Sequence, residues 1–277
     1  AFLFSSCSII KTISIIKSGE IVEEAYLFEI PFEVVHGEII ITVKIQGKYY
    51  RFAFDTGAMN VLSKKISDDL GIEAITEVKS SDAHQNENDI SLSKIDNISI
   101  GELDYKDQGF AIFDFDELQE IKCFDIHGII GANLMRNSIW QIDLQNKKML
   151  VASHIDSLNI RNADIIIPFT QQITGTPEIQ INISNLVFDN VIFDYGSNSG
   201  INLFSSNNQI DSLEINHKVI KSYGSSSIGL YGGKSDTISS IRLNTIKMGD
   251  KTIDEQIITL NNRGTSTIGT EVFKNIL

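Results

Sequence analysis

The sequence has little cysteine and little proline. It contains only two cysteines, Cys7 and Cys123, and three prolines in 277 residues. Two cysteines do not make a disulfide framework, and neither lies at metal-ligand spacing. The five histidines are scattered along the chain. We therefore expect no metal and no cofactor, and we interpret Cys123 as a small, buried apolar residue.

Positive charge is also scarce. Lysine and arginine total 23 against 36 aspartates and glutamates, which gives a net charge of −13. No run of basic residues occurs, so nucleic acid and anionic membrane surfaces are disfavoured as partners. No stretch reaches the roughly 18 apolar residues that a membrane-spanning helix needs. With 42% hydrophobic and 21% charged residues, the composition predicts a folded chain with a sizeable core.

Small residues precede the first cysteine. Residues 1–7 (AFLFSSC) are apolar, then small, then cysteine, and they resemble the end of a bacterial lipoprotein signal. This interpretation predicts a lipid on Cys7 and a location in the bacterial cell envelope, periplasmic or lipid-anchored. Residues 1–28 would then be a signal remnant and linker. The alternative is an ordinary apolar segment in which Cys7 is packed or free.

Three landmarks of the chain occur twice, in the same order and at nearly constant spacing. FDTGA at residues 54–58 returns as FDYGS at 193–197, and IPF at 30–32 returns at 167–169. The third pair is Ile130-Gly131 and Ile268-Gly269. The repeat predicts two homologous lobes, 29–155 and 156–277. Because the sequence ends soon after Gly269, we expect no second copy of the first lobe's final hairpin, by truncation or by design.

The pattern of apolar residues predicts a mostly β protein with short helices. Apolar and polar residues alternate at 39–46 and 178–183, and turn residues separate such runs. Helical spacing over Val61–Leu70 predicts a helix that ends at Gly71. Residues 128–135 indicate a strand entering a short helix, and 140–151 indicate a hairpin.

The repeated motif carries one aspartate per lobe, Asp55 and Asp194. Two carboxylates in contact cannot both ionise, so they share one proton. The ionised member then takes a proton from water, while the protonated member donates to the carbonyl oxygen under attack. Gly57 and Gly196 allow tight turns whose N–H groups reach the carboxylates. The Thr56 hydroxyl is placed to brace the opposing loop.

These motifs resemble the aspartic peptidases of the pepsin and retropepsin type. FDTGA followed by IIGANLM is that family's paired motif, and the hairpin at 140–151 resembles the closing strands of bacterial retropepsin-like proteins. Over about residues 29–277, the resemblance implies two β-barrel-like lobes, an active-site cleft between them, and a flap near Ser80–Ile90. It implies a peptide or protein substrate and a catalytic pair of Asp55 and Asp194; we expect a monomer. The supporting loops would be Thr56, Gly57, Ala58 and Tyr195, Gly196, Ser197.

The second copy departs from the family pattern. Tyr195 stands where the family has threonine or serine, and Thr267 replaces an apolar residue. Tyr223 and Tyr231 would either cover the cleft or lie on a surface loop. Three hypotheses follow: an aspartic endopeptidase, a catalytically weak or inactive peptide-binding module of the same fold, and a structural surface lipoprotein that assembles through its second lobe. We interpret His127 as a loop histidine with satisfied hydrogen bonds.

Overall fold

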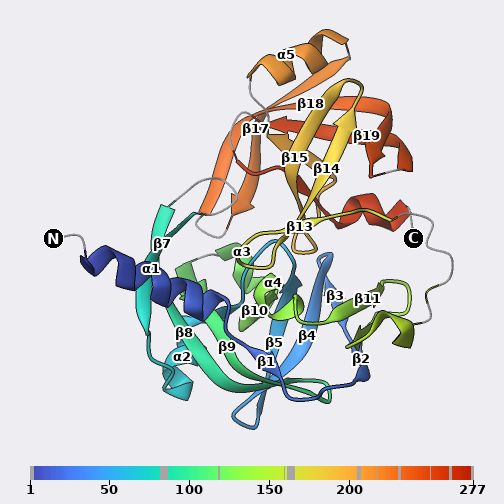
Figure 1. Cartoon of the computed structure of the whole chain (residues 1–277). Coiled ribbons are helices and arrows are strands. Elements are labelled where there is room, and N and C mark those ends of the chain that lie inside the picture. The colour runs from blue at the N-terminus through green and yellow to red at the C-terminus, as the bar shows by residue number, and fades with distance from the viewer. Residues whose placement is uncertain are drawn as a thin grey trace. The chain divides into compact units, whose positions relative to one another are not determined.

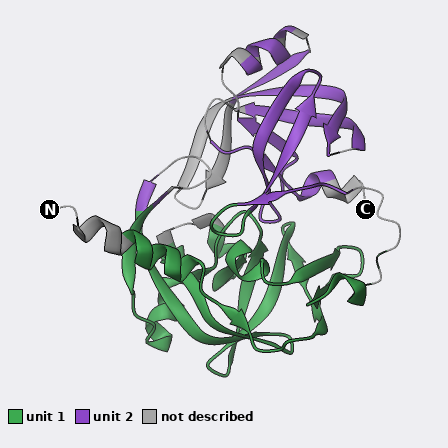
Figure 2. Ribbon diagram, in the orientation of Figure 1, with its two compact units in different colours: residues 1–79, 89–161, 172–176 green, residues 80–88, 162–171, 177–277 purple. Residues whose placement is uncertain are grey.

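The structure is a computed structural model, and its chain divides into two compact units (Figure 2). It describes residues 3–81, 87–117, 119–158, 160, 166–204, 207–216, 218–229, 232–249, 251–261 and 264–275. Unit 1 comprises residues 1–79, 89–161 and 172–176, and unit 2 comprises 80–88, 162–171 and 177–277. The predicted lobe boundaries at 28/29 and 155/156 remain predictions.

The strands of the first half of the chain belong mostly to unit 1 (Figure 1 and Figure 2). In chain order the elements are α1 (Leu3–Ile16), β1 (Glu20–Ile21), β2 (Leu27–Pro31), β3 (Glu33–Val35), β4 (Glu38–Ile45), β5 (Lys48–Asp55), β6 (Val61–Ser63), α2 (Lys64–Leu70), β7 (Thr76–Ser81), β8 (Glu87–Ile100), β9 (Leu103–Phe113), a 3-10 turn (Phe115–Glu117), α3 (Gln119–Lys122), β10 (Gly128–Gly131), α4 (Ala132–Met135), β11 (Ile139–Asp143), β12 (Lys148–Ala152) and a 3-10 turn (Ile155–Ser157).

Strands of unit 1 close into a barrel. The order β4-β5-β10-β6-β9-β8 returns to β4, because β8 pairs with both β9 and β4. Alternate residues of these strands point inward, and Phe52, Phe54 and Phe110 are almost completely buried there. Burying an aromatic side chain of this size contributes roughly 1.5–3 kcal/mol. The separate sheet β11-β12-β2 confirms the hairpin predicted at 140–151.

Unit 2 repeats this arrangement. Its elements are β13 (Thr170–Gln171), β14 (Pro177–Ile183), β15 (Leu186–Phe193), β16 (Ile201–Phe204), α5 (Asn207–Asn216), β17 (Val219–Gly229), β18 (Gly232–Met248), β19 (Lys251–Asn261), β20 (Thr267–Ile268) and a 3-10 turn (Thr270–Asn275).

The strand order β14-β15-β20-β16-β19-β18 also closes on itself, through the pairing of β14 with β18. Every pairing has the direction of its counterpart in unit 1. β15–β20 and β16–β19 are parallel, as are β5–β10 and β6–β9, and the other pairs of the ring are antiparallel. The mostly β class and the internal duplication are therefore confirmed.

The helix predicted over Val61–Leu70 is shorter than expected. Val61–Ser63 form β6, which is inserted between β10 and β9. The helix begins only after Ser63, whose hydroxyl accepts a hydrogen bond from the Ile66 N–H at 3.4 Å. Gly71 ends it in the left-handed region at φ 67°, where glycine carries no steric penalty. The pairing of Val61–Ser63 with β10 and β9 therefore overrides the helical spacing of these three residues.

One further sequence interpretation needs correction. Cys123 is exposed rather than buried, because it follows the short helix α3 in a surface loop. Most of residues 222–236 belong to the long strands β17 and β18. Tyr223 is 79% exposed on β17, whereas Tyr231 and residues 82–86 of the expected flap lie outside the described residues.

The segment expected to be a leader contributes to unit 1. Ile15 of α1 is buried, and β1 pairs with β9 through Glu20 and Ile21. Among the helices that the structure describes, none is long and apolar enough to cross a membrane.

Candidate active site

Asp55 lies at the end of a strand that is held on both sides. It is the last residue of β5, and β10 runs parallel to β5 with Gly131 opposite Asp55. The Gly57 N–H donates to Asp55 Oδ1 at 2.7 Å. Directly after Gly131 the chain is bonded back to the loop, since the Ala132 N–H donates to the Ala58 carbonyl at 2.8 Å. The carboxylate is thus oriented by backbone groups of its own loop.

Gly131 is required by close packing. A Cβ at this position would lie 2.3 Å from the carbonyl carbon of Met59 and 2.5 Å from the Ala58 oxygen. Any side chain would push the loop away from β10. Gly131 thus permits close packing beneath the aspartate loop.

A buried pair of asparagines fixes the loop from below. Asn60 Oδ1 accepts from the Gly131 N–H at 2.8 Å, and the Asn60 N–H donates to Asn133 Oδ1 at 2.7 Å. Both side-chain amides donate to one carbonyl, that of Gly109, at 3.1 and 2.9 Å. Both asparagines are fully buried, so these bonds satisfy groups that would be costly to leave unpaired.

The loop of Asp194 has the same backbone contacts. The Asp194 N–H donates to the Ile268 carbonyl at 2.9 Å, and the Gly196 N–H donates to Asp194 Oδ1 at 2.9 Å. The Thr270 N–H donates to the Ser197 carbonyl at 2.8 Å, as Ala132 does to Ala58. A Cβ on Gly269 would lie 2.3 Å from the Ser199 carbonyl oxygen.

The side chains that support the second loop are different. Serine and asparagine replace the asparagine pair: Ser199 Oγ lies 2.7 Å from Ser197 Oγ and accepts from Asn202 Nδ2 at 2.7 Å. Asn202 Nδ2 also lies 3.4 Å from Thr267 Oγ1. Thr267, which departs from the apolar family pattern, thus has a polar partner on β16.

Each aspartate strand carries a phenylalanine with an aromatic neighbour. Phe54 packs against Trp140 of β11 with ring centroids 5.3 Å apart, and Trp140 Nε1 donates to the Met135 carbonyl at the end of α4. In unit 2 the neighbour of Phe193 is Tyr195, with centroids 5.5 Å apart. Tyr195 therefore supplies the ring contact that Trp140 supplies in unit 1.

Tyr195 does not add charge to its loop. Burial raises the pKa of its hydroxyl to about 12, because the phenolate loses hydration. A tyrosine with a raised pKa is protonated at every pH below about 10, so it is neutral throughout the range in which carboxylates titrate.

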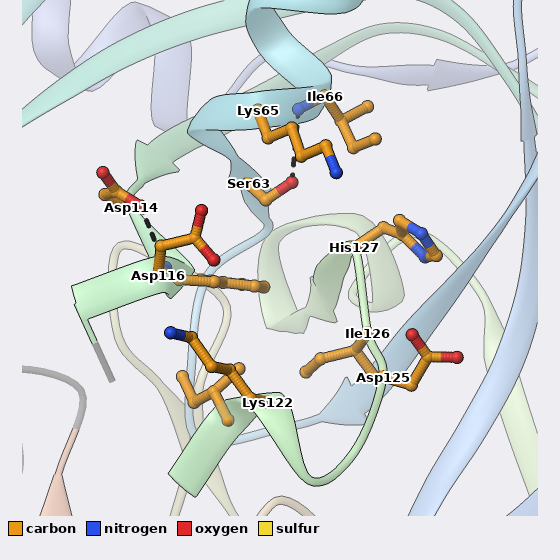
Figure 3. A pocket seen from close by; sticks show the side chains of 11 residues that line it. Ser63, Lys65, Ile66, Asp114, Asp116, Lys122, Asp125, Ile126 and His127 are labelled. Carbon is orange, nitrogen blue, oxygen red and sulfur yellow. Dashed lines mark hydrogen bonds between the residues drawn. The ribbon is translucent and has the colours of Figure 1, made fainter. Parts of the chain in front are cut away.

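The described pocket of unit 1 does not include the Asp55 loop (Figure 3). It has a volume of about 240 Å³, and Ile66, Phe115 and Ile126 line it together with charged residues such as Lys65 and Lys122.

His127 also lines the pocket. Its N–H donates to the Arg51 carbonyl at 2.8 Å, and its Nδ1 accepts from the Arg51 N–H at 3.2 Å. Arg51 is four residues from Asp55 on β5, which corresponds to about 13 Å of strand. The interpretation of His127 as a loop histidine with satisfied hydrogen bonds is confirmed.

Within each unit the structure brings the predicted loop residues together. It adds positions that sequence reasoning missed: Asn60, Asn133 and Arg136 in unit 1, Ser199 and Asn202 in unit 2. Asn60 and Asn133 are 73 residues apart, and no local pattern indicates that they meet. Among the described residues, no group of three or more histidine, cysteine, aspartate or glutamate side chains could hold a metal ion.

The fold and the loops resemble those of aspartic proteases. Residues 41–134 match the family model for aspartyl protease. The predicted resemblance to retropepsin-like aspartic proteases is thereby confirmed.

Two solved structures are similar to the chain. Basic 7S globulin from soybean shares the fold, with a TM-score of 0.52 at 11% identity over 90% of each chain. A retropepsin-like aspartic protease from Rickettsia conorii aligns with 49% of this chain and 93% of its own, at 17% identity and a TM-score of 0.35. No curated protein is similar enough to count as a relative.

Replacing Asn133 by alanine tests the buried network. The Asn60 N–H would lose its acceptor, so Asn133→Ala should lower the free energy of unfolding by about 2–3 kcal/mol. Urea unfolding followed by Trp140 fluorescence measures it. Asn146→Ala removes an exposed side-chain amide that donates to Asp143, and it should cost less than about 0.5 kcal/mol. Equal stability of the two variants would contradict the assigned role.

Proposed function

We propose that the protein is an aspartic endopeptidase in which Asp55 and Asp194 activate water as a pair. One observation carries the proposal. Asp55 ends β5 and Asp194 directly follows β15, each of these strands pairs in parallel with the strand of the Ile-Gly motif, and each aspartate accepts the N–H of the glycine two residues on. A turn aspartate with a purely structural role does not call for a second copy of this arrangement in an equivalent barrel.

The pair would work with a single shared proton. The ionised carboxylate removes a proton from water as the oxygen attacks the scissile carbonyl carbon, and the protonated carboxyl donates to the carbonyl oxygen. The tetrahedral gem-diol then collapses. Its C–N bond breaks, and the leaving nitrogen receives a proton from the pair. The titration belongs to the pair rather than to either aspartate, so neither residue is assigned a fixed role.

The surrounding groups support this chemistry by holding geometry. Gly57 and Gly196 each donate to Oδ1 of their aspartate, which restricts rotation of the carboxylate. Rigid loops matter because a misplacement of 1 Å can cost about 100-fold in rate. Thr56 is proposed to brace the opposing loop through its hydroxyl, and Ala58 and Ser197 anchor the loops through their carbonyls.

Substituting either aspartate tests the proposal. Asp55→Asn and Asp194→Asn should each lower the cleavage rate by a factor of about 1,000 or more, since each removes one half of the acid–base pair. The measurement is cleavage of a peptide library across pH 3–8, read by mass spectrometry. Asp254→Asn, at an exposed position of β19, is the matched control. Cleavage that survives Asp55→Asn would refute the mechanism.

A second candidate function is peptide binding with little or no hydrolysis, and Tyr195 favours it. The ring is much larger than the threonine or serine that the family pattern has there. The contact between Tyr195 and Phe193 gives the tyrosine a packing role that is compatible with either function.

Two substitutions at Tyr195 separate these candidates. If Tyr195 is a packing residue of an active enzyme, Tyr195→Phe keeps the cleavage rate, while Tyr195→Thr lowers stability by about 1–2 kcal/mol through loss of the ring pair. If the tyrosine suppresses hydrolysis, Tyr195→Thr gains cleavage over the wild type. Thermal unfolding and the cleavage assay, run on both variants, distinguish the outcomes.

We also propose that Cys7 carries a lipid that anchors the protein in the bacterial cell envelope. The support is the small residues before Cys7, and its place in α1 eight residues before the buried Ile15, or about 12 Å along a helix. Growth with a radiolabelled fatty acid should label the wild type and leave Cys7→Ser unlabelled. The exposed Cys123 gives the control, because Cys123→Ser should be labelled like the wild type; label on Cys7→Ser would refute the anchor.

A further inference from the structure

Arg136 lies where three segments distant in sequence meet. It follows α4 directly, and its N–H donates to the Ala132 carbonyl at 3.0 Å. One guanidinium nitrogen donates to the Ile16 carbonyl at 3.2 Å, and another donates to the Ile173 carbonyl at 3.2 Å. Within the part of the chain that the structure describes, these carbonyls are the side chain's hydrogen-bond partners, and no carboxylate pairs with it.

The first partner is the end of a helix. The last carbonyls of α1 lack intrahelical donors; the Ile13 carbonyl accepts from the Lys17 N–H and the Ile15 carbonyl from Ser18. Arg136 satisfies the Ile16 carbonyl. A cation at a helix C-terminus also interacts favourably with the helix dipole. Partial burial lowers the pKa of Arg136, yet a guanidinium remains protonated at any pH at which the protein folds.

The second partner belongs to a tight turn. Residues 172–176 form it, with the Gly175 N–H donating to the Gln172 carbonyl at 2.9 Å. Gly175 has φ +90°, and a Cβ there would lie 2.6 Å from the Ala132 carbonyl oxygen and 3.1 Å from Arg136 Cδ. The turn belongs to unit 1, whereas the residues directly before and after it belong to unit 2.

These contacts continue to the aspartate loop. The end of α1 is packed so closely on β9 that a Cβ on Gly109 would lie 2.1 Å from the Ile15 carbonyl oxygen. The Gly109 carbonyl in turn receives both amides of the Asn60–Asn133 network. On the other side, α4 is tied to the loop through Ala132 and Ala58. Arg136 therefore links α1, α4 and the 172–176 turn, and α1 and α4 are in turn connected to the Asp55 loop.

We propose that Arg136 is a positioning residue, which fixes α1 and the 172–176 turn against α4 and so holds Asp55 in its reactive position. The effect on catalysis rests on the proposed endopeptidase function; the effect on the two segments does not. From this turn the chain runs into β14 and then β15, and Asp194 directly follows β15.

The test compares three variants of the full chain. Arg136→Met keeps the aliphatic stem and removes the donors, Arg136→Lys keeps the charge and loses the fork that reaches two carbonyls, and Arg242→Met is the control. Arg242 is an exposed arginine of β18 paired with Glu255. Hydrogen exchange is read on peptides that cover residues 55–60 and 172–176, and cleavage kinetics are read as kcat and KM across pH.

We expect faster exchange of both segments in Arg136→Met and no change in Arg242→Met. We expect kcat to fall about tenfold or more with KM nearly unchanged, and an intermediate value for Arg136→Lys. Wild-type exchange in both segments would overturn the proposal, as would an unchanged kcat. Should Arg136→Met not fold, the exchange of Arg136→Lys at residues 172–176 decides by the same criterion. A wild type without cleavage would refute the endopeptidase, while the exchange data would still decide the role of Arg136.

Discussion

The parallel pairing of an aspartate strand with an Ile-Gly strand is the constraint on which both halves of the molecule depend. In each barrel, the strand that leads to the aspartate lies beside β10 or β20. The glycine that ends the neighbouring strand or follows it lies so close to the aspartate loop that a Cβ would approach within 2.3 Å. This contact leaves the loop little freedom and directs one carboxylate oxygen to the N–H of a glycine. The same strand order surrounds this contact in both barrels.

The two loops are alike in their backbone and unlike in their side chains. Unit 1 holds its loop with two fully buried asparagines that converge on one carbonyl. Unit 2 uses serine hydroxyls and the amide of Asn202. The aromatic contact differs in the same way, since Phe54 takes its partner from a distant hairpin and Phe193 takes it from the neighbouring Tyr195. The packing of Tyr195 on Phe193 thus explains within unit 2 why a tyrosine stands at this position. This explanation holds whether or not the protein cleaves peptides.

Local motifs explain which parts of the fold and the site could be predicted from sequence. The aspartate loops and the Ile-Gly strands are short, contiguous patterns, so their repetition revealed the duplication and the mostly β class. Val61–Ser63 were misassigned because three residues fit a helix as well as a strand, and only the neighbours β9 and β10 decide. Cys123 was misassigned because cysteine is usually buried, and its exposure depends on the loop after α3. Asn60 and Asn133 were missed because their meeting depends on barrel closure rather than on spacing.

Arg136 illustrates why such long-range contacts leave little trace in sequence. Its two partners are backbone carbonyls, which every residue type presents, so the side chains of Ile16 and Ile173 need not vary together with it. In the contacts described above, the arginine fork and the glycines that allow close approach are the parts whose chemistry depends on residue identity. The N-terminal helix, interpreted from sequence as a leader, packs on β9 in unit 1, which composition does not indicate. The C-terminal end of this helix packs on Gly109, whose carbonyl accepts both amides of the Asn60–Asn133 network behind the Asp55 loop. A lipid anchor at Cys7 would be compatible with this packing, since Cys7 lies about 12 Å from Ile15 along the helix.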